Sequence, residues 1–102
     1  MSVVVVATIL PLPDHRDEVI AAIRSTVEQV HAEDGCELYA LHEAPDRLVM
    51  VEKWESADAL AVHGKGPALA GLGRALAGKV AGAPEVIMLR PLPAGDAAKG
   101  EL

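Results

Sequence analysis

The chain has 102 residues, of which 51% are hydrophobic, and these values are typical of one small domain with a packed core. The formal net charge is −6 and the nine basic residues are scattered, which excludes a basic patch for nucleic acid or for an anionic membrane. The single cysteine excludes an internal disulfide and is compatible with the cytoplasmic location that we expect, and no stretch is long enough to span a bilayer.

The first predicted element is a strand from Val3 to Leu10, a continuous β-branched run that ends at Pro11 and Pro13. Both faces of this strand are apolar, so we expect it to be central in a sheet and covered on both sides. No basic residue precedes the run and the prolines follow at once, which is not the pattern of a signal peptide.

A helix is predicted from Asp14 to Asp34, with Asp14 as the expected cap and Gly35 as the expected stop. Apolar residues within it recur at intervals of four, four and three, which is the period of one helix face: Val19, Ile23, Val27 and Val30.

The next two segments are predicted to form a β-hairpin around the turn Ala44-Pro45-Asp46-Arg47. In its first strand, Cys36 to Glu43, strict alternation places on one face Cys36, Leu38, Ala40 and His42, and on the other Glu37, Tyr39, Leu41 and Glu43. Its second strand lies within Leu48 to Ser56 and places on one face Leu48, Met50, Glu52 and Trp54.

Two helical segments and a strand complete the chain. Ser56 is the expected cap of a short helix from Ala57 to His63, and Pro67 begins a third helix whose apolar stripe runs to Val80. The last strand is predicted over residues 85–92, so residues 1–92 form the domain and residues 93–102 a mobile tail. This order predicts an α+β, ferredoxin-like split βαβ fold, with an antiparallel sheet and its helices on one face.

The candidate catalytic residues are His63 and Glu52, which we expect to border one space between sheet and helices. An imidazole suits a general base, because it titrates close to neutral pH, and the alternative for His63 is a polar helix end. Glu52 is predicted to orient His63 or to accept a substrate hydroxyl, and its alternative is an ion pair with Arg47, Arg74 or Arg90. We expect the imidazole at the cavity mouth and partly exposed, so that its removal barely changes the melting temperature.

Three more side chains are candidates for substrate binding. Trp54 offers a flat wall for an aromatic ring, or it belongs to the core. Tyr39 can donate a hydrogen bond, whereas His42 faces the other side of the same strand, so at most one of them is expected at a given cavity. The four histidines and one cysteine lack metal-ligand spacing, and no metal is assigned.

Taken together, these residues resemble the antibiotic biosynthesis monooxygenase family. The resemblance runs from Val3 to Pro91 and is carried by Gly35-Cys36, Tyr39, Leu41-His42, Glu52-Lys53-Trp54-Glu55-Ser56, Ala59-Leu60 and His63. It implies a homodimer, the dimeric α+β barrel, in which two sheets pack face to face and each sheet encloses a cavity with its own helices. Members with shown activity oxidise phenols or quinols with O₂ and use neither metal nor flavin.

The resemblance therefore predicts a monooxygenase without a cofactor that acts on a small aromatic quinol or phenol. The alternative is a non-catalytic dimeric module that binds an apolar metabolite. A cavity lined by His63 together with an acid or a phenol favours the enzyme, and a closed, wholly apolar interior favours the binding module. A haem-degrading relative uses an asparagine on its first strand, where this chain has Ala7 or Thr8, so we expect a colourless protein.

Overall fold

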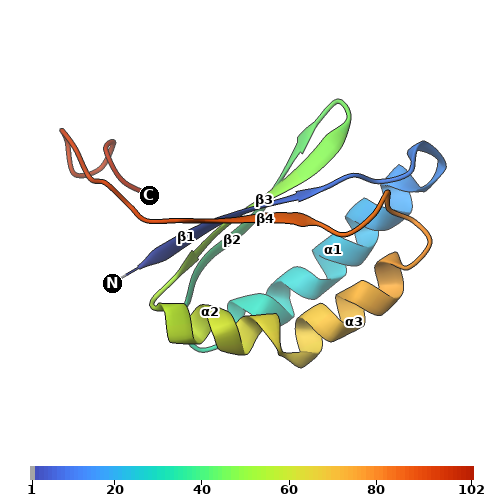
Figure 1. Cartoon of the computed structure of the whole chain (residues 1–102), viewed down its shortest axis with the longest axis horizontal. Coiled ribbons are helices and arrows are strands. Elements are labelled where there is room, and N and C mark those ends of the chain that lie inside the picture. The colour runs from blue at the N-terminus through green and yellow to red at the C-terminus, as the bar shows by residue number, and fades with distance from the viewer. Residues whose placement is uncertain (1) are drawn as a thin grey trace.

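In residues 2–102, which the computed structural model describes, a four-stranded antiparallel sheet forms one layer and three helices form the other (Figure 1). The elements are, in order, β1 (Val3–Ile9), a 3₁₀ turn (Pro13–His15), α1 (Arg16–His31), β2 (Cys36–Ala44), β3 (Arg47–Trp54), α2 (Ala57–Gly64), α3 (Pro67–Leu76) and β4 (Glu85–Leu89). The strand order β2-β3-β1-β4 confirms the ferredoxin-like fold.

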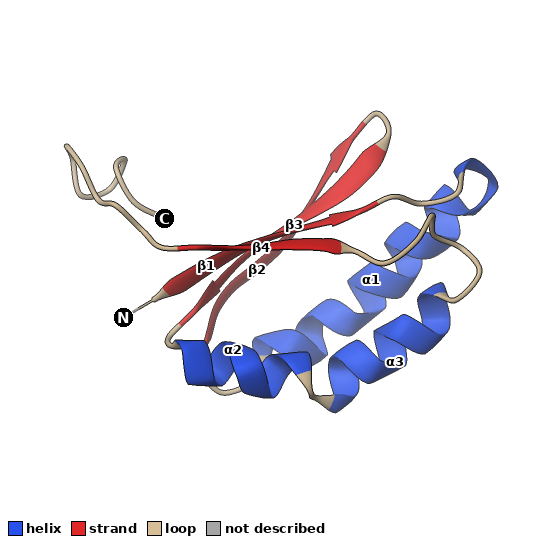
Figure 2. Cartoon of the chain, viewed as in Figure 1, coloured by secondary structure: helices blue, strands red, loops and turns tan. Residues whose placement is uncertain are grey.

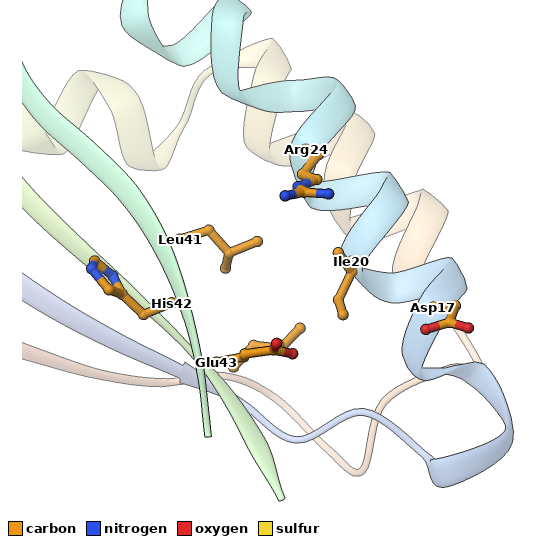
Figure 3. Close-up of a pocket in the computed structure, with 7 residues that line it drawn as sticks. Asp17, Ile20, Arg24, Leu41, His42 and Glu43 are labelled. Carbon is orange, nitrogen blue, oxygen red and sulfur yellow. The ribbon is translucent and has the colours of Figure 1, made fainter. Parts of the chain in front are cut away.

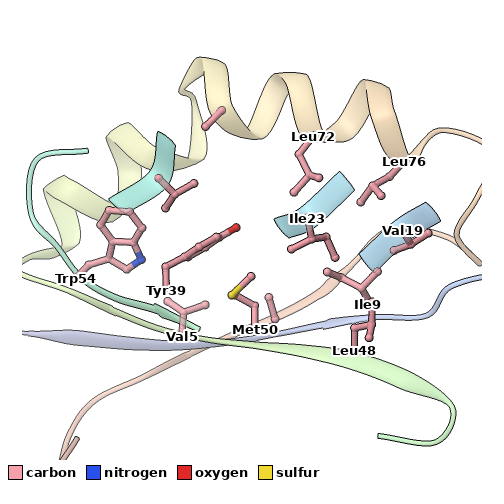
Figure 4. Packing of buried hydrophobic residues seen from close by; sticks show 13 residues of the cluster. Val5, Ile9, Val19, Ile23, Tyr39, Leu48, Met50, Trp54, Leu72 and Leu76 are labelled. Atoms are coloured by element: carbon pink, nitrogen blue, oxygen red, sulfur yellow. The ribbon is translucent and has the colours of Figure 1, made fainter. Parts of the chain in front are cut away.

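The core lies between the sheet and the helices, which all cover the same face of the sheet (Figure 2). The register places Val5 opposite Glu52 and Ala7 opposite Met50, so the predicted inward face of β3 is confirmed. Figure 4 shows the buried side chains of both layers meeting, and its helical members include Val19, Ile23, Leu72 and Leu76. The apolar stripes of α1 and α3 are therefore what attaches these helices to the sheet.

Several predicted boundaries are wrong, among them the end of the first helix, which lies at His31 and not at Asp34. Helix α1 begins at Arg16, and Asp14 lies in the preceding 3₁₀ turn and does not cap it. Helix α3 ends at Leu76, and Val80 makes a β-bridge with Pro11 instead of extending the helical stripe. The last strand ends at residue 89, three residues before the predicted end.

A β-bulge changes the predicted alternation at the start of β2. Trp54 lies opposite Cys36 and Lys53 lies opposite Leu38, so Glu37 is the extra residue between them. Cys36 consequently shares the inward face with Tyr39 and packs against the core, contrary to the strict alternation.

The outer face of the sheet carries no helix in residues 2–102, so the helices cover only one face of the first strand, and the cover expected on its other face stays a prediction. The strand is central, as predicted, and lies between β3 and β4. The chain end returns toward this face, where the Lys53 ammonium group donates to the Leu102 carbonyl oxygen at 2.6 Å. Val4 lies beside this chain end and is buried.

Candidate active site

A cavity of about 240 Å³ lies between the sheet and helices α2 and α3. Most of its lining is aliphatic and comes from β1, β3, α3 and the start of β4, including Val5, Ala7, Ile9, Met50, Leu69, Leu72 and Val86. The lining also contains the polar side chains of Tyr39, Glu52 and His63. The cavity thus combines an apolar space with polar groups, an arrangement typical of small-molecule sites.

Helix α2 carries His63 into this cavity from its last turn. The helix begins after Ser56, whose hydroxyl oxygen accepts the Ala59 N–H at 3.1 Å, which confirms the predicted cap. The His63 side chain is only 3% exposed, so the expectation of a partly exposed ring is wrong. The rings of Trp54 and Tyr39 lie close to it and Glu33 lies at its Nδ1, so the ring is buried as well as part of the cavity lining.

Glu33 is the residue that covers the outer edge of the imidazole. Its Oε1 lies 2.7 Å from Nδ1 of His63, and its side chain is 22% exposed. Glu33 follows α1 in a tight turn, in which its N–H donates to the Val30 carbonyl and its carbonyl accepts the Cys36 N–H. Glu33 was not predictable as a site residue from the sequence, because it belongs to no apolar or motif pattern.

Gly35 allows this turn to approach α2 closely. It has a φ of 81°, in the left-handed region, and a β-carbon at this position would lie 2.5 Å from the Ala59 β-carbon. Its carbonyl also accepts the Glu55 N–H at 2.8 Å, which ties the turn to the end of β3. The close approach brings Glu33 within reach of His63.

Glu52 lies on the cavity side of the imidazole. The Trp54 indole N–H donates to its Oε1 at 2.9 Å, and the same oxygen lies 3.9 Å from Nε2 of His63. Burial raises the pKa of Glu52, and the Trp54 hydrogen bond and the His63 ring oppose this rise. The predicted closeness of Glu52 and His63 is observed, and Arg47, one alternative partner, instead pairs with Asp46.

Trp54 and Tyr39 are the aromatic neighbours of the His63 imidazole. The centroids of the Trp54 and His63 rings lie 4.4 Å apart at an interplanar angle of 31°. The centroids of the Tyr39 and His63 rings lie 5.6 Å apart, in an edge-on arrangement. Trp54 is fully buried and is not part of the cavity lining, whereas Tyr39 is. Burial, and next the charge of Glu52, raise the pKa of Tyr39, so its hydroxyl stays protonated and is a donor.

Comparison with known proteins gives the family of this chain. The profile of the family described as "Antibiotic biosynthesis monooxygenase" matches residues 2–71, which is more than half of the chain. The chain belongs to the antibiotic biosynthesis monooxygenase family. No helix among residues 2–102 of this family member has the length and apolar character needed to cross a membrane.

Solved structures of relatives share the fold. The family member is similar to Rv0793 from Mycobacterium tuberculosis, with 37% identity over 67 residues that cover 64% of this chain and 66%, just under two thirds, of that protein. The structure of Rv0793 superposes with a TM-score of 0.85 at 28% identity, over 94% of this chain and 100% of that one. A structure from Caulobacter crescentus CB15 that carries the same family name superposes with a TM-score of 0.80, at 28% identity over 86% and 87% of the two chains.

Two predicted substrate-binding residues of this family member do not line the cavity: Trp54, which lies in the core, and His42. His42 borders an open groove between α1 and β2, and Figure 3 shows its ring pointing away from α1 while Leu41 points toward it. The His42 ring is exposed and its Nδ1 lies 3.1 Å from the Ala40 carbonyl oxygen. Of Tyr39 and His42, Tyr39 lines the cavity.

Proposed function

We propose that this protein is a monooxygenase without a cofactor, which oxidises a small aromatic quinol or phenol with O₂. The observation that carries the proposal is the position of the two ring nitrogens of His63. Glu33 occupies Nδ1, and Nε2 lies on the side of Glu52, within the cavity. A general base is thus aimed into a largely apolar space, where a phenol hydroxyl would be the group to deprotonate.

In this reaction the substrate itself supplies the electrons that reduce O₂. His63 takes the hydroxyl proton at Nε2, and the electron-rich phenolate passes one electron to O₂. The superoxide and phenoxyl radicals then combine at a ring carbon that bears hydrogen, forming a C–O bond and a peroxide. Loss of that hydrogen as a proton and cleavage of the O–O bond leave a ring carbonyl. The departing oxygen leaves as water, whose two protons are the one from His63 and the one from the ring carbon. One oxygen atom enters the product, one becomes water, and the substrate supplies all four electrons.

The apolar walls and the neutral Tyr39 hydroxyl have separate roles in this scheme. The aliphatic side chains around the cavity exclude bulk water from the peroxide and place the ring, which is the contribution that a substrate-driven oxidation needs. The Tyr39 hydroxyl is a donor for a substrate oxygen. The presence of an acid, a phenol and a base in one lining supports the oxygenase over a binding module with a wholly apolar interior.

The experiment that tests the proposal is ¹⁸O₂ turnover. A panel of hydroquinones and naphthalenediols is offered in an oxygen electrode with a chelator present, and products are analysed by mass spectrometry. The expected result is one ¹⁸O atom per product molecule and one O₂ consumed without hydrogen peroxide. Uptake that yields hydrogen peroxide and an unlabelled quinone would mean plain autoxidation, and binding without uptake would favour the binding module.

A further inference from the structure

We propose that Glu33 is a positioning residue, which holds His63 in its Nδ1–H tautomer so that Nε2 is the proton-accepting atom in the cavity. This inference rests on the proposed function for its catalytic meaning. The tautomer itself is a property of the resting protein and can be measured without any substrate. An experiment can therefore reject the tautomer and the oxygenase function independently of each other.

The geometry leaves one arrangement of hydrogens at the ring. A neutral imidazole carries one N–H, and a carboxylate only accepts hydrogen bonds. At 2.7 Å the Glu33 oxygen is within the distance of a short charge-assisted hydrogen bond, so the proton belongs on Nδ1. At the other edge the nearest Glu52 oxygen is 3.9 Å from Nε2, beyond hydrogen-bond distance, and that oxygen already accepts the Trp54 N–H.

The ring has little freedom to abandon this orientation. The ring centroids of Trp54 and Tyr39 lie 4.4 Å and 5.6 Å from that of His63, and the residue is 3% exposed. A flip of the imidazole would exchange Nδ1 for a carbon next to Glu33 and would leave that carboxylate without its partner. The cost of leaving such a group unpaired in a partly buried place disfavours the flip.

Within residues 2–102, the contacts that hold Glu33 are the backbone hydrogen bonds of its turn and the His63 ring. The turn that carries it bonds to Val30 and Cys36, and Gly35 anchors the turn to Glu55 beside α2. Glu33 is also absent from the cavity lining, so it cannot touch a substrate there. It can act only through His63, by fixing the tautomer and by stabilising the imidazolium that forms when Nε2 takes a proton.

The test is long-range ¹H–¹⁵N spectroscopy of protein labelled with [¹⁵N]histidine, at a pH where His63 is neutral. The His63 signals are assigned by their loss in His63→Gln. The expected spectrum of the unaltered protein shows His63 with a protonated Nδ1 and a bare Nε2. Glu33→Ala should shift its ring toward a mixture of both tautomers, whereas Glu28→Ala, an exposed glutamate on α1, should leave the ring unchanged.

Turnover supplies the second readout. In Glu33→Ala, kcat for the best quinol of the panel should fall by about 10-fold to 100-fold, the size of effect seen when a group that orients a functional histidine is removed, with KM unchanged. A resting spectrum with Nε2–H as the main tautomer would overturn the proposal even if the enzyme is active. An Nδ1–H spectrum in a protein that oxidises no quinol would keep the positioning role and reject the oxygenase. Full kcat in Glu33→Ala, with turnover otherwise present, would show that the contact is structural only.

Discussion

Nδ1 of His63 lies 2.7 Å from a carboxylate oxygen of Glu33, a residue thirty positions earlier in the chain. The contact joins the turn after α1 to the last turn of α2. On the opposite edge of the ring, β3 supplies Glu52, whose own oxygen is held by Trp54. The turn after α1, helix α2 and strand β3 therefore meet at one imidazole.

Replacement of His63 by alanine should reduce turnover by about 10²-fold to 10⁴-fold, the usual contribution of a positioned acid–base group. Because the ring is buried and hydrogen-bonded, the variant should also lose about 1–3 kcal/mol in the free energy of unfolding. Oxygen uptake and urea denaturation measure the two effects. His15→Ala, at the surface beside Glu18, is the control, and normal turnover in the folded His63 variant would remove the base assignment.

Glu52 should make the protein less stable as pH rises. Burial raises its pKa above the ordinary value of 4.5, so the folded state binds this proton more tightly than the unfolded state. Between pH 4.5 and the folded pKa the unfolding free energy therefore falls with increasing pH. Glu52→Gln lacks this titration, so its stability relative to the unaltered protein should be greater at pH 8 than at pH 4. Urea midpoints across this range measure it, and a constant difference would contradict the raised pKa.

Tyr39→Phe should keep the fold and weaken substrate binding. The hydroxyl has no hydrogen-bond partner among residues 2–102, so its removal strands no protein group. Loss of one neutral hydrogen bond to a substrate oxygen costs about 1 kcal/mol, which corresponds to a rise of about fivefold in KM. Since the pKa of Tyr39 is raised, the unaltered enzyme should show no loss of activity from its ionisation near pH 10. Steady-state kinetics and the pH profile check both statements.

The outer face of the sheet should form the interface of a homodimer. It presents Val6 and Val51 as directly paired neighbours, and Ile87 and Leu89 on it are 46% and 43% exposed. Sedimentation equilibrium at micromolar concentration should give about 21 kDa, twice the 10.6 kDa of one chain. Val51→Arg should shift the protein to a monomer, and Val62→Arg, on the exposed side of α2, should not. A monomer without any substitution would reject the barrel arrangement.

Gly35→Ala should lower the free energy of unfolding by more than its backbone strain alone explains, and it should change the His63 tautomer. Gly35 and Gly78 both have left-handed φ angles, 81° and 77°, so alanine costs about 1–2 kcal/mol at either. Only at Gly35 does the new methyl group meet another atom, the Ala59 β-carbon at 2.5 Å, whereas Gly78 has open space. We expect Gly35→Ala to be the less stable variant and the one that shifts the His63 tautomer. Equal losses of stability and identical histidine spectra would show that the close approach is unimportant.

The periodic features of the chain were predictable from the sequence, because periodicity records which face of an element is buried. Alternation along β3 placed Leu48, Met50, Glu52 and Trp54 on the inward face, and all four are buried. The Ser56 cap was predictable for a local reason, since its partner is three residues away. Local order of this kind was enough for the fold class and for the family.

The surroundings of His63 depended on tertiary structure. Neither the 30-residue separation from Glu33 nor the steric fit of Gly35 against Ala59 leaves a periodic trace, because each is one contact between segments that the fold brings together. The bulge at Glu37 likewise breaks the alternation of β2 and moves Cys36 to the inward face, and only the pairing with β3 shows where this break falls. The sequence alone therefore determined the inward face of the regular strands and helices, and the packing of the α1–β2 turn on α2 decided that His63 is buried with one nitrogen bound and the other in the cavity.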